Sequence, residues 1–172
     1  VRLEDAIKVT RDLTEAARRK EIEDAIGREK EIYNLLEVLA RKSKNNVILV
    51  GEAGVGKTKV VEGLAVAIAE GRLSEEFSKF RIVELNLASL MSGTQYRGVF
   101  EEKIVELLNT LKEDKNNVLF IDEIHLIMGA GSTGEGGMDL ANLLKPALGR
   151  GEIRCIGATT LAEYRKFIEK DP

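Results

Sequence analysis

Hydrophobic residues along this chain follow two different spacings. Short, continuous apolar runs rich in β-branched residues are typical of buried strands. They occur at Asn46–Val50, Phe80–Leu87, Val118–Ile121 and Ile153–Ala158. Elsewhere, apolar residues recur every three or four positions, as they do on one face of an amphipathic helix. The segments with this second spacing are Arg11–Lys20, Glu29–Ala40, Lys57–Glu70, Val99–Leu111, Met138–Leu148 and Leu161–Glu169.

This alternation predicts the fold class. Strands separated by helices of ten or more residues form parallel β-α-β units, with the sheet in the middle and helices on both faces. We therefore expect an α/β fold with a central parallel sheet. One stretch stands apart, because five of the nine residues in Gly129–Gly137 are glycine. Such a segment cannot contribute to a packed core and predicts a loop.

The turn after the first apolar strand carries a recognisable chemical motif. Residues 51–58 read Gly-Glu-Ala-Gly-Val-Gly-Lys-Thr, which fits the phosphate-binding pattern G-x-x-x-x-G-K-[ST]. Glycines let the backbone turn its N–H groups inward, and the helix N-terminus adds the positive end of its dipole. We expect Lys57 to reach the β- and γ-phosphates and the Thr58 hydroxyl to bind Mg²⁺. The sequence therefore predicts a nucleoside triphosphate site, with an ordinary glycine-rich turn as the alternative.

A second candidate site follows the strand Val118–Ile121, which ends in the adjacent carboxylates Asp122 and Glu123. In ATPases with a phosphate loop, an acidic residue at a strand end helps to hold Mg²⁺, a role that Asp122 fits. Glu123 is our candidate for the base that polarises the attacking water. Taken alone, such a pair is more often a solvated strand end. Because a phosphate loop precedes it in the same chain, the pair favours hydrolysis over binding alone.

Composition excludes several other classes of protein. The 172 residues are one domain's worth, and the net charge of −3 argues against a dominant nucleic-acid-binding face. No apolar run approaches the roughly 20 residues needed to span a bilayer, and no secretory signal opens the chain. We therefore expect the protein in the cytosol. The single cysteine, Cys155, lies in an apolar run and is interpreted as a core residue rather than a reactive thiol.

Together these motifs resemble those of the AAA+ ATPases, and specifically the first nucleotide-binding domain of the Clp-type unfoldases (the ClpB, ClpC and ClpA group). The resemblance covers nearly the whole chain. Beyond the phosphate loop it rests on residues 93–98 (Gly-Thr-Gln-Tyr-Arg-Gly), 119–125 (Leu-Phe-Ile-Asp-Glu-Ile-His), 144–148 (Leu-Lys-Pro-Ala-Leu), 157–160 (Gly-Ala-Thr-Thr) and 168–171 (Ile-Glu-Lys-Asp). It implies a P-loop NTPase three-layer sandwich with a central parallel five-stranded sheet.

The resemblance also implies a domain organisation. Residues 1–172 would form a single large α/β subdomain, with an N-terminal helical segment over 1–44. In the family, paired arginines and a small helical subdomain follow the region of Asp171, and this sequence ends at Pro172. We therefore expect the chain by itself to bind nucleotide but to hydrolyse it poorly, because the arginine finger that acts on the neighbouring subunit lies outside it.

Tyr96 acquires a role only through the resemblance. It is similar to the aromatic residue of the axial pore loop that grips an unfolded polypeptide. From the residues alone, a tyrosine between Gly93 and Gly98 could equally well anchor its own loop. Gln95 precedes it where the family usually carries lysine, which removes a cation from the pore. The stretch Gly129–Gly137 resembles the second pore loop.

Further nucleotide contacts follow from the resemblance. Thr160 is similar to the sensor between the γ-phosphate and Glu123, with Thr159 as the alternative because neighbouring strand residues face opposite sides. Ile26 and Gly27 resemble the segment that packs against adenine. The implied nucleotide-binding set is Ile26, Gly27, Gly51, Glu52, Ala53, Gly54, Val55, Gly56, Lys57, Thr58 and Val60. The implied catalytic residues are Glu123, Lys57 and Thr160, and the Mg²⁺ ligands are Thr58 and Asp122.

The implied function is a motor. Hydrolysis of ATP in a ring, hexameric in the family, would move Tyr96 along the pore and pull a polypeptide through it. The alternative is a regulatory module that signals nucleotide state by conformation and threads nothing. A nucleic-acid ATPase is disfavoured by the acidic balance of the chain. A disaggregase and an unfoldase that feeds a partner protease both remain open.

Overall fold

The computed structural model describes residues 10–22, 29–39, 46–51, 56–73, 79–85, 97–114, 116–124, 146 and 153–160. The strands within these ranges are β1 (Thr10–Asp12), β2 (Asn46–Val50), β3 (Arg81–Leu85), β4 (Asn117–Asp122) and β5 (Arg154–Thr159). The helices are α2 (Leu13–Arg18), α3 (Glu29–Leu39), α4 (Lys57–Ala69) and α6 (Arg97–Lys112). The helices expected at 138–148 and 161–169 lie outside the described residues, apart from position 146.

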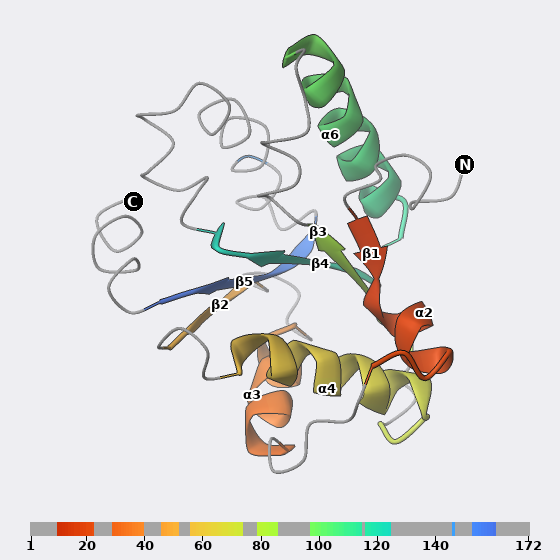
Figure 1. The fold of residues 1–172 in the computed structure, drawn as a ribbon, viewed down its shortest axis with the longest axis vertical. Helices are drawn as coiled ribbons and strands as arrows, with labels where there is room; N and C mark the ends of the chain where they lie inside the picture. Colours follow the sequence, from red (N-terminus) through yellow and green to blue (C-terminus); the bar gives the residue numbers. More distant parts are fainter. Residues whose placement is uncertain are drawn as a thin grey trace.

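The strands form one five-stranded sheet in the order β1-β3-β4-β5-β2. Neighbouring pairs among β3, β4, β5 and β2 are parallel, which confirms the predicted β-α-β architecture. Helices cover both faces of the sheet, with α2, α3 and α4 on one side and α6 on the other (Figure 1). The link to α6 includes a hydrogen bond from the Asn117 side chain in β4 to the Leu111 carbonyl, at 3.3 Å.

The fifth strand is one that the apolar pattern did not predict. β1 pairs antiparallel with β3, with Arg11 opposite Glu84. The helix expected from Arg11 starts only at Leu13, because Asp12 caps it and its carboxylate accepts a hydrogen bond from the Glu15 N–H at 3.0 Å. The same Asp12 side chain pairs with Arg81 in β3. One buried carboxylate therefore ends β1, starts α2 and joins both to the sheet.

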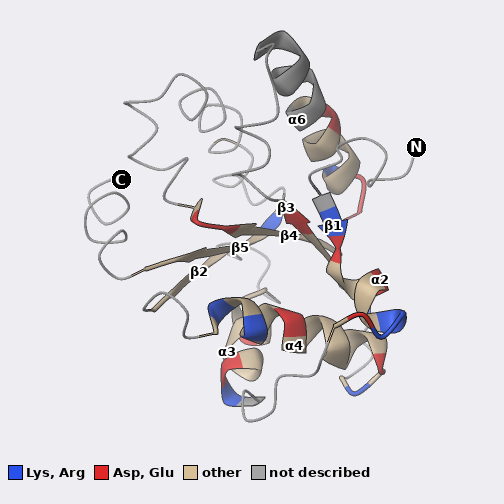
Figure 2. Cartoon of the chain, in the orientation of Figure 1, with Lys and Arg blue, Asp and Glu red and all other residues tan. Residues whose placement is uncertain are grey.

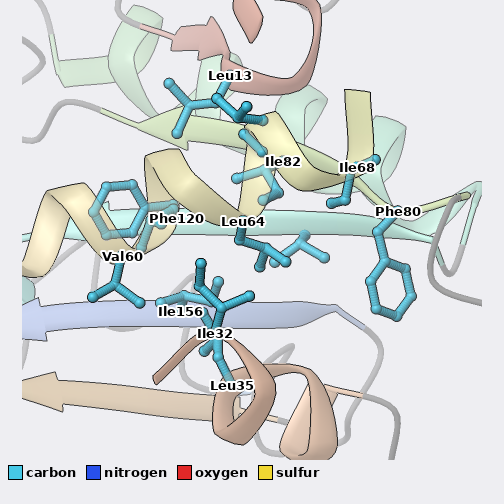
Figure 3. Close-up of a cluster of buried hydrophobic side chains, with 14 of the residues drawn as sticks. Leu13, Ile32, Leu35, Val60, Leu64, Ile68, Phe80, Ile82, Phe120 and Ile156 are labelled. Atoms are coloured by element: carbon cyan, nitrogen blue, oxygen red, sulfur yellow. The ribbon is translucent and has the colours of Figure 1, made fainter. Parts of the chain in front are cut away.

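The main core lies between the sheet and the three helices on its α4 face (Figure 3). Val61, Leu64 and Ala65 of α4 are fully buried, as the helical spacing predicted. The sheet contributes Phe120 of β4 and Ile156 of β5 to the same cluster. Since side chains alternate along a strand, Asp122 lies on the α4 face with Phe120, two residues before it.

The described helices were also compared with the length and hydropathy that a membrane span requires. Within the described part of the chain, none is long and apolar enough to cross a bilayer.

Candidate nucleotide-binding site

The phosphate loop is anchored at both ends of its described part. Gly51, directly after β2, donates its N–H to the carbonyl of Thr159 at the end of β5, at 3.2 Å. At the other end Gly56 precedes α4 with a φ of 88°, a left-handed conformation that glycine adopts without a Cβ penalty. The loop therefore starts from the edge of the sheet where β2 and β5 end, and it finishes as the N-terminus of α4.

The first turn of α4 has the features of an anion site. Among the described residues no side chain caps this turn. Uncapped N–H groups at a helix N-terminus, together with the helix dipole, favour a bound phosphate. Lys57, the first residue of α4, points its ammonium group back toward the end of β2 and donates to the Gly51 carbonyl at 3.3 Å. The cation and the helix N-terminus therefore lie together, as a triphosphate requires.

Val60, one turn further on, is buried in the core between α4 and the sheet (Figure 3). Its N–H donates to the Gly56 carbonyl at 3.2 Å, which closes the first turn of the helix. The described contacts of Val60 thus fix the first turn of α4 against the core. Its predicted contact with a nucleotide stays a prediction.

The acidic pair stands at the carboxyl end of β4. Asp122 is half-buried and lies beside Ala158 of β5 in the sheet register. Its Oδ1 accepts a hydrogen bond from the N–H of Glu123 at 2.9 Å. Figure 2 shows the acidic end of β4 and the basic start of α4 at the same end of the sheet. Because the carboxyl ends of parallel strands meet at one edge, the sheet brings the two predicted motifs together.

Glu123 has an unusual backbone. Its φ is 53°, one of two positive values among the described non-glycine residues, and its side chain is exposed. For a residue with a Cβ the left-handed region is sparsely populated, so the surroundings must hold it there. The chain thus turns sharply at the residue that we expect to face the attacking water.

One carboxylate near this site was not identified from the sequence. Glu84 in β3 is half-buried, and burial raises its pKa. The nearby Arg11 guanidinium acts in the opposite direction, whereas the carboxylates of Asp122 and Glu62 raise the pKa further. The available signal was a single acidic residue within the otherwise apolar stretch Ile82–Leu85. Glu84 therefore adds negative potential on the side of Asp122 that faces β1.

Mg²⁺ fits the oxygen donors at this edge. Thr58 lies in the first turn of α4 and Asp122 at the end of β4, and both supply hard oxygen ligands. Within the described residues no group of three or more His, Cys, Asp or Glu side chains is arranged to hold a metal. Two protein ligands suit Mg²⁺ in nucleotide sites, where phosphates and water complete the octahedron.

The two threonines at the end of β5 differ in environment. Thr159 is 2% exposed and closes the strand, whereas Thr160 follows it and is half-buried. Ala158 belongs to the core on the α4 face. If the alternation continues by one position, Thr160 lies on that face and Thr159 on the other.

Several predicted residues lie outside the described part of the chain. They are Ile26, Gly27, Glu52, Ala53, Gly54, Val55, Tyr96 and the stretch Gly129–Gly137. The interpretation of Cys155 is confirmed, since it is buried and burial raises the pKa of its thiol to about 12. A thiol held in its neutral form in this way is a core residue and a poor nucleophile.

Known proteins are similar to this chain in both sequence and fold. The chain is 53% identical over 169 residues to heat shock protein hsp98 of Neurospora crassa, which covers 98% of this chain and 18% of that protein. It is 53% identical over 161 residues to chaperone protein ClpB of Aquifex aeolicus, covering 94% of this chain and 16% of that protein. The chain thus spans less than a fifth of the length of either relative.

Solved structures of Hsp104 have the same fold. The closed state of Hsp104 with ATPγS and FITC casein matches with a TM-score of 0.83 and 43% identity, over 99% of this chain and 28% of that one. The Hsp104–ADP complex of Saccharomyces cerevisiae matches with a TM-score of 0.81 and 44% identity, over 95% of this chain and 28% of that one. Residues 47–168 match the ATPase family associated with various cellular activities (AAA), and the chain therefore belongs to this family.

Proposed function

We propose that this chain binds MgATP and hydrolyses ATP at the carboxyl edge of its sheet. The observation that carries the proposal is the meeting of two motifs there, the start of α4 with Lys57 and the end of β4 with Asp122 and Glu123. Membership of the AAA family, and similarity to Hsp104 structures solved with ATPγS or ADP, support it. Mg²⁺ would supply charge neutralisation between the phosphate oxygens.

Each residue then has a distinct task. The N–H groups of the loop and of the first turn of α4, with the Lys57 ammonium, bind and orient the phosphates. Thr58 and Asp122 hold the metal ion. Glu123 takes the proton of the water that attacks the γ-phosphate. Thr160 orients that water, which the strand alternation favours over Thr159.

Hydrolysis is tested with Glu123→Gln in the natural full-length protein. Glutamine keeps the size of the side chain but cannot accept the proton, so we expect ATP turnover to fall by about 10²-fold or more while nucleotide binding persists. Lys57→Ala is the complementary variant, and it should lose binding as well. Turnover of Glu123→Gln at the wild-type rate would contradict the assignment of the base.

At the scale of the whole protein, we propose a ring-forming unfoldase or disaggregase of the ClpB and Hsp104 type, hexameric and cytoplasmic, that threads polypeptides. Residues 1–172 would be the large α/β subdomain of one ATPase module, with residues 1–44 as its N-terminal segment. The similarity to ClpB, and to an Hsp104 structure that contains FITC casein, supports the proposal. A partner protease or chaperone is compatible with both activities.

Threading depends on Tyr96 in this proposal. Tyr96→Ala in the natural full-length protein should leave ATP turnover within about twofold of wild type, because the residue binds substrate rather than nucleotide. Unfolding of a tagged model substrate should be lost. Tyr96→Phe is the matched control and should retain unfolding, since an aromatic ring still grips the polypeptide. Unfolding at the wild-type rate by Tyr96→Ala would favour the regulatory switch instead.

A further inference from the structure

The turn after β4 docks onto the neighbouring strand at a single glycine. Ile124 is 2% exposed, and its side chain lies directly over Gly157 of β5. A Cβ at position 157 would be 2.7 Å from Ile124 Cδ1, 3.1 Å from Cγ2 and 3.3 Å from Cβ. Gly157 is flanked in the register by Ile121 of β4 and Ile48 of β2, so it lies in the interior of the sheet.

Rotation about χ2 of Ile124 would not by itself make room for a side chain at position 157. All three nearest atoms belong to Ile124, and only Cδ1 is at the free end of that side chain. Rotation about χ2 would move Cδ1 away but would leave Cβ and Cγ2 where they are. These two contacts are tighter than nine in ten real Cβ contacts, so Ile124 would have to give way by a few tenths of an ångström. Because Ile124 is 2% exposed and closely packed, its surroundings also leave little room for Cδ1 to move into.

The residue that such a shift would reach first is Glu123. Its φ of 53° makes it the pivot between the end of β4 and the docked Ile124. On one side its N–H is held by Asp122 Oδ1 at 2.9 Å, and on the other side the next residue is packed over Gly157. These two contacts hold Glu123 from both sides in a backbone conformation that is sparsely populated for residues with a Cβ.

We propose that Gly157 is a positioning residue for ATP hydrolysis, because its lack of a side chain lets Ile124 dock on β5 and thereby fixes the backbone of Glu123. The inference rests on the proposed function, in which Glu123 acts on the attacking water. Gly157 and Ile124 act through Glu123, and neither is placed in contact with the nucleotide.

The geometry separates this effect from nucleotide binding. Ala158 belongs to the core on the α4 face, so a Cβ at Gly157 would project from the opposite face of β5. The phosphate loop, Lys57 and Thr58 lead into or lie on α4. A substitution at position 157 should therefore disturb Glu123 while leaving the phosphate-binding elements in place.

The test is Gly157→Ala in the natural full-length protein, with kcat and the Kd for ATPγS measured separately. A displacement of about 1 Å at a reacting group can cost about 10²-fold in rate, so we expect kcat to fall by about 10-fold or more. The Kd should stay within about threefold of wild type. Adding Ile124→Val to Gly157→Ala removes Cδ1, the atom nearest to the new methyl group, and should restore part of the lost kcat.

Gly71→Ala is the matched control for a general loss of stability. Gly71 has a φ of 69° at the far end of α4, and a Cβ there would meet nothing within 4 Å. Alanine at that position is strained without pressing on any neighbour, so the protein should unfold more easily while kcat stays within about twofold of wild type. A lower kcat in Gly157→Ala alone would then report the contact with Ile124.

If Gly157→Ala does not fold, Ile124→Ala decides the matter, because it removes the docked atoms and adds none. It should lower kcat at an unchanged Kd. Turnover of the folded variant within about twofold of wild type would overturn the inference, as would an equal loss of kcat and nucleotide affinity. A double variant no faster than Gly157→Ala would overturn it too. A wild-type protein that binds but never hydrolyses ATP would overturn the proposed function, and the inference with it.

Discussion

Glu84 is an ionisable side chain in a partly buried environment that disfavours its charged form. It lies in β3 between the buried Val83 and Leu85, and burial is the main cause that raises its pKa. Arg11, opposite it in β1, offsets this only in part. Because the pKa is raised above the value of an unfolded glutamate, the folded state binds this proton more readily than the unfolded state does.

The sign of the pH dependence follows from that difference. The contribution of Glu84 to stability is fully present below the unfolded pKa and is lost as the pH rises through the folded pKa. Glutamine is neutral at every pH, so the 172-residue chain with Glu84→Gln should be more stable than wild type at pH 7.5. The difference should shrink toward pH 4, as measured by urea unfolding in buffer without Mg²⁺.

Glu106→Gln is the matched control, since Glu106 is exposed on α6. It should leave the midpoint unchanged at both pH values. If Glu84→Gln instead lowers stability at pH 7.5, the pairing with Arg11 outweighs burial and the direction of the pKa shift is wrong.

Asp12 joins three elements and allows their coupling to be measured. Its carboxylate caps α2, pairs with Arg81 of β3 and closes β1, while its side chain is 2% exposed. Asp12→Ala removes both the cap and the ion pair and should destabilise the chain by about 2–3 kcal/mol in urea unfolding. Asp12→Asn keeps a good capping residue and loses only the charge, so it should cost about 1 kcal/mol.

The difference between the two Asp12 variants isolates the cap from the ion pair. Equal losses in both would mean that the cap contributes nothing. A loss below about 0.5 kcal/mol in Asp12→Ala would show that β1 and α2 are not held through this residue.

The same elements show what the sequence could predict. β2, β3, β4 and β5 lie on the four apolar runs, and α3 and α4 match their predicted bounds within one residue. Buried parallel strands and amphipathic helices can be predicted from their own residues, because the spacing of apolar residues within each segment is enough to identify it. β1 cannot be predicted in this way, since its three residues read Thr-Arg-Asp and become a strand only by pairing with β3.

The candidate site divides in the same way. The phosphate loop and the acidic pair were predicted because each is formed by consecutive residues that make a recognisable motif. The contact of Ile124 with Gly157 and the setting of Glu84 beside Arg11 could not be, since both depend on the register between strands distant in sequence. Gly157 was part of a motif recognised in the sequence, residues 157–160, but its contact with Ile124 could be found only in the folded sheet.

At the scale of the molecule, the proposed nucleotide would bridge elements that are otherwise joined mainly through the sheet. The Gly51 N–H to Thr159 carbonyl bond already ties the loop to the end of β5, and Asp122 ends the strand beside it. A ligand that binds only the folded state stabilises it by about 2.7 kcal/mol at a concentration of 100 times Kd. For a domain of this size that corresponds to a rise in Tm of about 5–10 °C.

We therefore expect ATPγS with Mg²⁺ to raise the Tm of the 172-residue chain by that amount in a thermal-shift measurement. Glu123→Gln should show the full rise, because the base is needed for turnover and not for binding. Lys57→Ala should show little or none, since the phosphates lose their cation, and Asp122→Asn should lose the part of the rise that depends on Mg²⁺. An equal rise in wild type and Lys57→Ala would place the nucleotide elsewhere. A rise in wild type that is the same with and without Mg²⁺ would remove Thr58 and Asp122 from the metal site.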